Sequence, residues 1–158
     1  RLKIERDTSS RGHTKEAVVQ SLKARENDSL KYIAPQRHQA DLIVSVSDHA
    51  DSNESVKNVI KVDFESEPKP FDYRLVSELS MVCGLEADII DVSPNKRVLR
   101  VWGGGSPAEL STVFARLEPR VSDILGSPHA WSEGSAGVVQ LVTMIHLANA
   151  LRRKRLVI

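Results

Sequence analysis

Two arginines around an aspartate, close to the beginning of the chain, are the residues best suited to chemistry. Arg6 directly precedes Asp7, Arg11 follows, and Gly12 and His13 complete the segment just before a region with helical spacing. Guanidinium groups present forked donors that match phosphate oxygens, and they keep their positive charge. The pattern is therefore suited to a compact, hinged cationic loop that binds phosphate. Solvated charges ahead of a helix are the more common explanation of such a pattern.

Other stretches give weaker signals, each with a structural alternative. The run Gly-Gly-Gly-Ser at 103–106 leads into a predicted helix, where its free amides would bind an anion or simply begin the helix. The basic run at 152–155 would contact nucleic acid or phosphate, or only complement a helix dipole. The five histidines show no metal-ligand spacing, so no metal site is predicted. Cys83 is the lone cysteine and is expected to be a small structural thiol.

The chain has neither a recognisable nucleotide-binding loop nor a strong overall charge. The pattern G-x-x-x-x-G-K-[ST], whose loop cradles nucleotide phosphates, does not occur in the sequence. With 22 Lys and Arg against 21 Asp and Glu, the net charge is only +1, so no overall field attracts nucleic acid or an anionic membrane. Neither is an expected partner, and any affinity for anions must be local.

The length of 158 residues allows a hydrophobic core without disulfides or metal ions. A single cysteine and the lack of an apolar run of membrane-spanning length predict a soluble protein of the cytoplasm. The chain begins at Arg1 within a charged stretch, and we expect it to be a piece of a longer polypeptide.

Hydrophobic spacing predicts the elements that must position these residues. Helices are expected at 14–25, 71–83, from 107 past 117, and 138–151, and strands at 42–46, 56–64, 88–92 and 97–102. A short turn at 30–33 should end at Pro35, because the residue before a proline avoids the helical region. Ser106, Pro107 and Glu109 form a strong helix-start signature. A polar, aperiodic stretch at 48–55 predicts a linker.

Two phrases at a defined separation resemble a known family. They are I-x-R-D-x-x-x-R-G-H at 4–13 and Y-I-x-P-Q-x-x-x-A-D at 32–41. Together they resemble the phosphoribulokinase and uridine kinase family of P-loop kinases, and are most similar to the plant and cyanobacterial class of phosphoribulokinases. The resemblance covers residues 3–46 well and the rest of the chain only loosely.

The resemblance implies an α/β fold in three parts. Residues 1–47 would supply the lid and the last core strand of a P-loop kinase, 48–55 a linker, and 56–158 an appended α+β domain. The family uses ATP and Mg, which bind in an N-terminal kinase half that this chain does not contain. We therefore expect the chain alone to be inactive and to bind no cofactor through a recognisable motif of its own.

The resemblance also implies roles for individual residues. The family reaction moves the γ-phosphoryl group of ATP to a hydroxyl of a small-molecule substrate, a sugar phosphate such as ribulose 5-phosphate in the most similar members. Arg6 and Arg11 fall on lid arginines that close over the phosphates, and Asp7 would orient Arg6. His13 is a candidate for the acceptor phosphate. Tyr32 and Gln36 are further substrate-binding candidates, with a core role for Tyr32 as the favoured alternative.

Two alternatives to a ribulose 5-phosphate type of kinase stay open. One is part of a uridine or other nucleoside kinase, and the other is a non-catalytic dimerisation or ligand-binding domain. A strand that is separated from its sheet exposes an unpaired edge. We therefore expect a homo-oligomer, with the edge of the strand at 42–46 or the hairpin at 88–102 as the contact.

Overall fold

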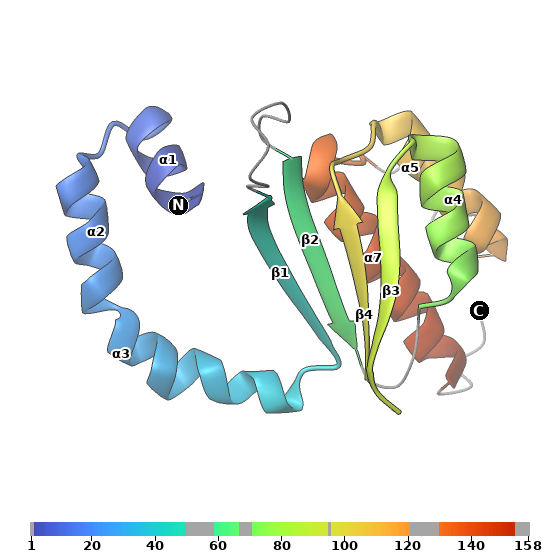
Figure 1. The fold of residues 1–158 in the computed structure, drawn as a ribbon, viewed down its shortest axis with the longest axis horizontal. Coiled ribbons are helices and arrows are strands. Elements are labelled where there is room, and N and C mark those ends of the chain that lie inside the picture. Colours follow the sequence, from blue (N-terminus) through green and yellow to red (C-terminus); the bar gives the residue numbers. More distant parts are fainter. Residues whose placement is uncertain (1, 50–58, 67–70, 95, 121–129, 154–158) are drawn as a thin grey trace. The chain divides into compact units, whose positions relative to one another are not determined.

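The computed structural model of the chain consists of two compact units, residues 1–41 and residues 42–158. The residues that the structure describes are 2–49, 59–66, 71–94, 96–120 and 130–153. The described residues of the first unit form helices and their connecting turns, whereas the second unit is an antiparallel sheet covered by helices (Figure 1).

The first unit is a succession of short helices. They are α1 (Leu2–Ser9), α2 (Lys15–Ala24), α3 (Glu26–Asp28), η1 (Ser29–Ile33) and η2 (Ala34–Gln39). The predicted helix at 14–25 is confirmed, and Thr14 caps it by accepting a hydrogen bond from the Ala17 amide. The turn before it passes through Gly12, whose φ of 67° is a left-handed conformation that favours glycine.

Two local predictions for this unit were wrong. The cationic segment was predicted as a loop, but it is helical up to Ser9, so that only the turn before Thr14 is irregular. The helical run also continues past Pro35 instead of ending there. Pro35 lies in the first turn of the 3-10 helix η2. The N–H groups of a first helical turn have no partner within the helix, so a proline is tolerated there.

The second unit is built on a four-stranded sheet with the order β1-β2-β4-β3 and antiparallel pairing throughout. Its strands are β1 (Leu42–His49), β2 (Val59–Ser66), β3 (Glu86–Ser93) and β4 (Lys96–Trp102). All four strands lie where the sequence predicts strands. The mixture of helices with an antiparallel sheet is consistent with the predicted α/β class, in its α+β form.

The division between the units differs from the predicted one. The strand that begins at Leu42 pairs with β2 inside the second unit, and the boundary falls directly before it, between residues 41 and 42. The predicted linker at 48–55 starts within β1, and its residues from 50 onward lie outside the described part of the chain. The sequence pattern finds the strand but does not reveal its partner.

In the described residues, three helices and one face of the sheet form the core. They are α4 (Tyr73–Cys83), α5 (Pro107–Leu117) and α7 (Gly134–Arg153). Alternate residues of the two central strands are fully buried against them, namely Val62, Phe64, Leu99 and Val101. By length and composition α7 is also apolar enough to cross a membrane, which corrects the expectation that the chain holds no such run. Much of its apolar side is buried in the core, at Val138, Leu141, Val142, Ile145 and Ala148, whereas Leu147 is half exposed.

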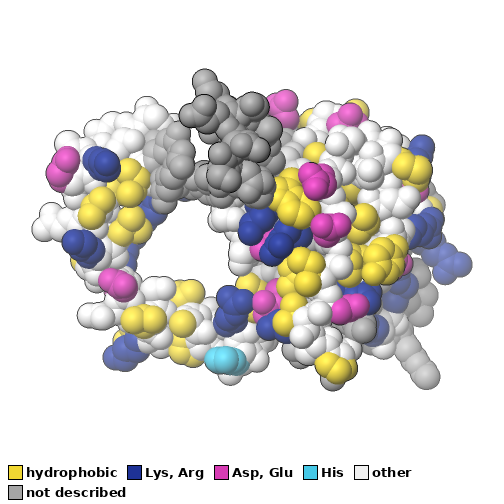
Figure 2. All heavy atoms as spheres, in the orientation of Figure 1, with side chains coloured by type: hydrophobic (Ala, Val, Ile, Leu, Met, Phe, Trp, Pro, Cys, Tyr) yellow, Lys and Arg dark blue, Asp and Glu magenta, His cyan; other side chains and the backbone are white. Residues whose placement is uncertain are grey.

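The opposite face of the sheet carries charged pairs. Arg100 donates to Asp63 with a distance of 2.8 Å from Nε to Oδ1, and Lys96 pairs with Glu65. Partial burial raises the pKa of Asp63, but the hydrogen bonds and charge of Arg100 outweigh it, so the pKa lies below its ordinary value. Figure 2 shows basic and acidic side chains interspersed on the visible side of this unit. This face is therefore neither strongly basic nor strongly acidic.

Candidate functional site

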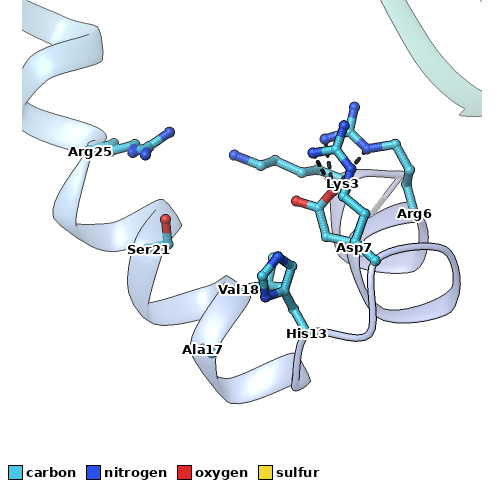
Figure 3. A pocket seen from close by; sticks show the side chains of 9 residues that line it. Lys3, Arg6, Asp7, His13, Ala17, Val18, Ser21 and Arg25 are labelled. Atoms are coloured by element: carbon cyan, nitrogen blue, oxygen red, sulfur yellow. Dashed lines mark hydrogen bonds and ion pairs between the residues drawn. The ribbon is translucent and has the colours of Figure 1, made fainter.

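A basic cavity of about 500 Å³ lies within the first unit, between α1 and α2 (Figure 3). Among the described residues, its lining contains the basic side chains of Lys3, Arg6, Arg11 and Arg25 and the acidic side chain of Asp7. The residues that line it are Lys3, Arg6, Asp7, Arg11, His13, Ala17, Val18, Ser21 and Arg25.

Helical spacing places these side chains on facing walls. In α1, Lys3 and Asp7 are four residues apart and therefore share one side of the helix. In α2, Ala17 and Ser21 have the same spacing, and Arg25 follows four residues later as the C-terminal cap. The turn at Gly12 reverses the chain, so that the two short helices enclose the cavity.

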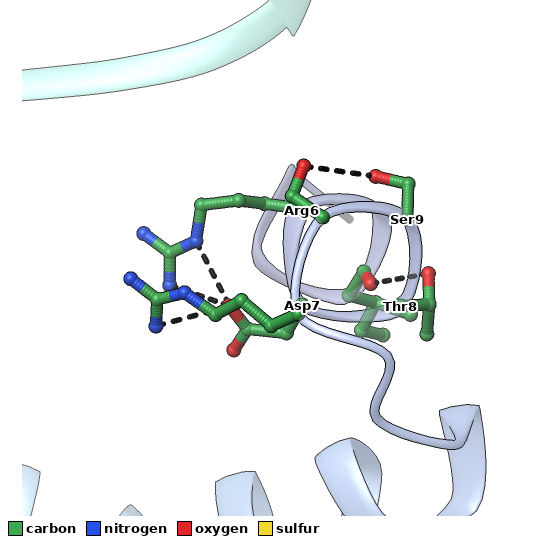
Figure 4. A network of polar contacts seen from close by, with 7 residues as sticks. Arg6, Asp7, Thr8 and Ser9 are labelled. Atoms are coloured by element: carbon green, nitrogen blue, oxygen red, sulfur yellow. Dashed lines mark hydrogen bonds and ion pairs between the residues drawn. The ribbon is translucent and has the colours of Figure 1, made fainter.

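Asp7 holds two of the guanidinium groups in place. Its carboxylate is buried, and Oδ1 accepts from Arg6 Nε at 2.9 Å, while Arg11 Nη1 lies 3.5 Å from the same oxygen (Figure 4). The hydrogen bond from Arg6 is the main cause that lowers the pKa of Asp7, and the charges of Arg6, Arg11 and Lys3 act in the same direction. The carboxylate therefore stays ionised and orients both arginines.

The two arginines keep donors free for a ligand. Their side chains are 54% and 58% exposed, and only part of each guanidinium faces Asp7. A guanidinium has five N–H donors, so several remain for further acceptors. The backbone N–H of His13 donates to the carbonyl oxygen of Asp7 at 3.0 Å, which fixes the turn at the rim of the cavity.

Lys3 and Arg25 supply a second pair of positive charges. Figure 3 shows their side chains extending toward each other from opposite helices. Within the described part of the chain, neither side chain makes a hydrogen bond or an ion pair. Two like charges that face each other in this way are unfavourable until an anion lies between them. The cavity is therefore suited to a ligand with several negatively charged oxygens.

The structure brings together four of the six predicted site residues. Arg6, Asp7, Arg11 and His13 all line the cavity, whereas Tyr32 and Gln36 do not. Gln36 instead donates from Nε2 to the backbone oxygen of Tyr32 at 2.9 Å. Tyr32 is 55% exposed in this chain, and its predicted role beside the lid stays a prediction.

Five of the nine described lining residues were missed by the sequence analysis, and the polar ones among them are Lys3, Ser21 and Arg25. Their signal was present as spacings of three and four residues that continue the pattern of the recognised ones. For Lys3 it could not be used because the segment with Arg6 was predicted as a loop, and a loop has no fixed face. Ser21 and Arg25 lie on the predicted helix at 14–25, but which side of that helix faces the cavity depends on α1.

The other candidate stretches have structural roles in the described residues. The Gly105 carbonyl accepts from the Gly134 amide at 3.0 Å, and Ser106 forms the predicted capping box with Glu109. Arg152 from the basic run pairs with the buried carboxylate of Glu118. Burial is the main cause that raises the pKa of the Cys83 thiol to about 11, so it is a protonated structural thiol. Among the described residues, no cluster of His, Cys, Asp and Glu is placed to hold a metal ion.

Comparison with known proteins finds its matches in the part of the chain that contains the first unit. Residues 1–53 match the model of the Phosphoribulokinase / Uridine kinase family. A stretch of 44 residues is 46% identical to phosphoribulokinase from Synechocystis sp., covering 28% of this chain and 13% of that protein. No solved structure matches the chain. The family-level resemblance inferred from the sequence is thus confirmed, and the matched residues 1–53 include the whole cavity.

Proposed function

We propose that this chain is the C-terminal part of an ATP-dependent kinase that phosphorylates a hydroxyl of a sugar phosphate of the ribulose 5-phosphate type. Residues 1–41 act in it as the lid that closes over the phosphates. One observation carries the proposal: a cavity with four basic residues around one buried carboxylate lies inside the segment that matches the kinase family. The remaining part, up to residue 158, is an appended α+β domain.

The cavity suits the demands of phosphoryl transfer. Catalysis of this reaction depends mostly on positioning and on stabilising negative charge, and one arginine can be worth about 10³ to 10⁵ in rate. Arg6 and Arg11 donate to phosphate oxygens, and Asp7 holds both in the required orientation. Lys3 and Arg25 neutralise further charge from the opposite walls, and His13 lies at the rim.

The donor set fits the phosphates of ATP but not its metal ion. Bound ATP with Mg²⁺ would supply the phosphoryl group that passes to the acceptor hydroxyl. The cationic side chains of the cavity would hold phosphate oxygens, whereas its one carboxylate is already engaged by arginines. The ligands of Mg²⁺ therefore belong to the N-terminal kinase half, which is the first partner of this chain.

The edge of β1 offers the place for that partner. β1 is an outer strand of the sheet, with β2 on one side only, and Val44 and Val46 are exposed on it. In the intact cytoplasmic protein, a strand of the kinase half pairs with this edge, which makes β1 an inner strand that joins the two sheets. In the chain alone the same edge is open to a second copy, and a homo-oligomer results.

The test is release of ADP by the intact parent kinase with ATP and Mg²⁺, measured with ribulose 5-phosphate, with uridine and without an acceptor. We expect turnover with ribulose 5-phosphate and none by the 158-residue chain. Arg11→Ala should lower turnover by about 10³-fold, because it removes charge from the lid, while the matched exposed Arg37→Ala leaves it unchanged. Turnover with uridine alone would reassign the acceptor, and silence with both acceptors would overturn the proposal.

A further inference from the structure

The α2 wall of the cavity differs in character from the α1 wall. Its lining residues Ala17, Val18 and Ser21 have short side chains, and they lie opposite the long side chains of Lys3 and Arg6 (Figure 3). Small residues on this wall leave the space into which Lys3 and Arg25 extend. The one neutral hydrogen-bond donor that α2 adds to this space is the hydroxyl of Ser21.

The hydroxyl of Ser21 is available to a ligand. Helical serine and threonine hydroxyls commonly donate to the carbonyl four residues earlier. Thr8 does so to Ile4 at 2.8 Å, and Thr112 does so to Ala108 at 2.9 Å. Within the described residues, the Ser21 hydroxyl makes no such bond and no other hydrogen bond. It lies one helical turn before Arg25, on the same side of α2.

We propose that Ser21 is a specificity-determining residue that donates a hydrogen bond to an oxygen of a phosphate group held between Lys3 and Arg25. This inference rests on the proposed function and names a contact within the same site. The ionised oxygens of a phosphate group accept hydrogen bonds. A neutral donor such as the Ser21 hydroxyl, placed between two cations, therefore adds a contact to the bound phosphate without repelling it. A carboxylate at the same position would instead occupy both cations and exclude the ligand.

The test is binding of inorganic pyrophosphate to the full 158-residue chain, measured by isothermal titration calorimetry. Ser21→Ala should weaken binding about tenfold, the usual loss for one hydrogen bond to a charged group. Ser21→Thr keeps the hydroxyl and should restore most of the affinity. Ser21→Asp should abolish binding, whereas Gln20→Asp, an exposed position on the same helix that does not line the cavity, should bind as the unmodified chain does.

The outcomes separate this inference from the proposed function. Unchanged affinity in Ser21→Ala, together with weakened binding in Lys3→Met, would overturn the role of Ser21 and leave the phosphate cavity standing. Equal losses in Ser21→Asp and Gln20→Asp would also overturn it, because a general effect of charge on α2 would then explain both. If the unmodified chain binds no pyrophosphate, the role of Ser21 and the phosphate cavity both fail. Circular dichroism of each variant shows whether α2 is intact.

Discussion

Asp7 determines how much of the positive charge around it is available for a ligand. It is only 6% exposed, yet it contacts one guanidinium by a hydrogen bond and a second by an ion pair. Without this carboxylate, Arg6 and Arg11 would repel each other across the mouth of the cavity. The acid therefore lowers the net charge of the site but holds the remaining donors in a fixed arrangement, as recognition of a phosphate group requires.

The protonation of Asp7 gives a prediction at the same scale. Because its pKa in the folded chain lies below the ordinary 3.8, the contribution of Asp7 to stability is fully present above the unfolded pKa and is lost as the pH falls through the folded value. A carbon-13 NMR titration of the Asp7 carboxyl should have its midpoint below 3.8, and Arg6→Gln should move it upward. A midpoint at or above 3.8 in the unmodified chain would contradict the arrangement described for Arg6 and Asp7.

The two glycine-containing segments of the second unit show how closely its elements pack. A Cβ atom on Gly104 would lie 2.2 Å from the backbone carbon of Gly134, and one on Gly137 would lie 2.1 Å from the Ser132 oxygen. These are backbone contacts, so neither clash can be relieved by a side-chain rotation. The segments before α5 and at the start of α7 can therefore approach each other closely only because glycine has no side chain. This requirement explains why both segments are rich in glycine.

Gly104→Ala should consequently destabilise the chain. The expected loss is about 1–3 kcal/mol in the free energy of unfolding, the usual cost of inserting a methyl group where the backbone has to move. Urea denaturation followed by circular dichroism measures it, and Ser111→Ala, at an exposed position of α5, serves as the control. Equal midpoints for the two variants would show that the glycine loop tolerates a side chain and would remove this explanation of the packing.

The elements also show what the sequence could and could not predict. α4 and α5 were predictable because their capping residues, Gly84 and Ser106, are next to regular apolar spacing. The partner of β1 was not predictable, since the pairing of two strands depends on residues distant in the sequence. For the site, Arg6 and Asp7 are sequence neighbours and could be recognised together, whereas Lys3 and Arg25 meet only through the geometry of two helices.

At the scale of the whole molecule, the two units differ in their similarity to known proteins and in their hydrophobic packing. Residues 1–53 match a kinase family, whereas most of the sheet, with its buried core, extends beyond the matched residues. The first unit has few buried apolar side chains, and Leu30 and Ile33 are exposed in it. Its short helices therefore have little hydrophobic packing of their own within the described residues, and the contacts around Asp7 are the polar ones that link α1 to the turn before α2.

The central claim is that phosphate binds in the cavity between α1 and α2. The most direct measurement is a titration of the nitrogen-15 labelled chain with inorganic pyrophosphate, followed by amide NMR spectra. The account predicts that the amides of residues 3–25 shift, with Ser21 and Arg25 among them, while those at 103–106 and 134–137 stay unchanged. Shifts confined to the glycine-rich segments, or no shift in α1 and α2, would contradict it.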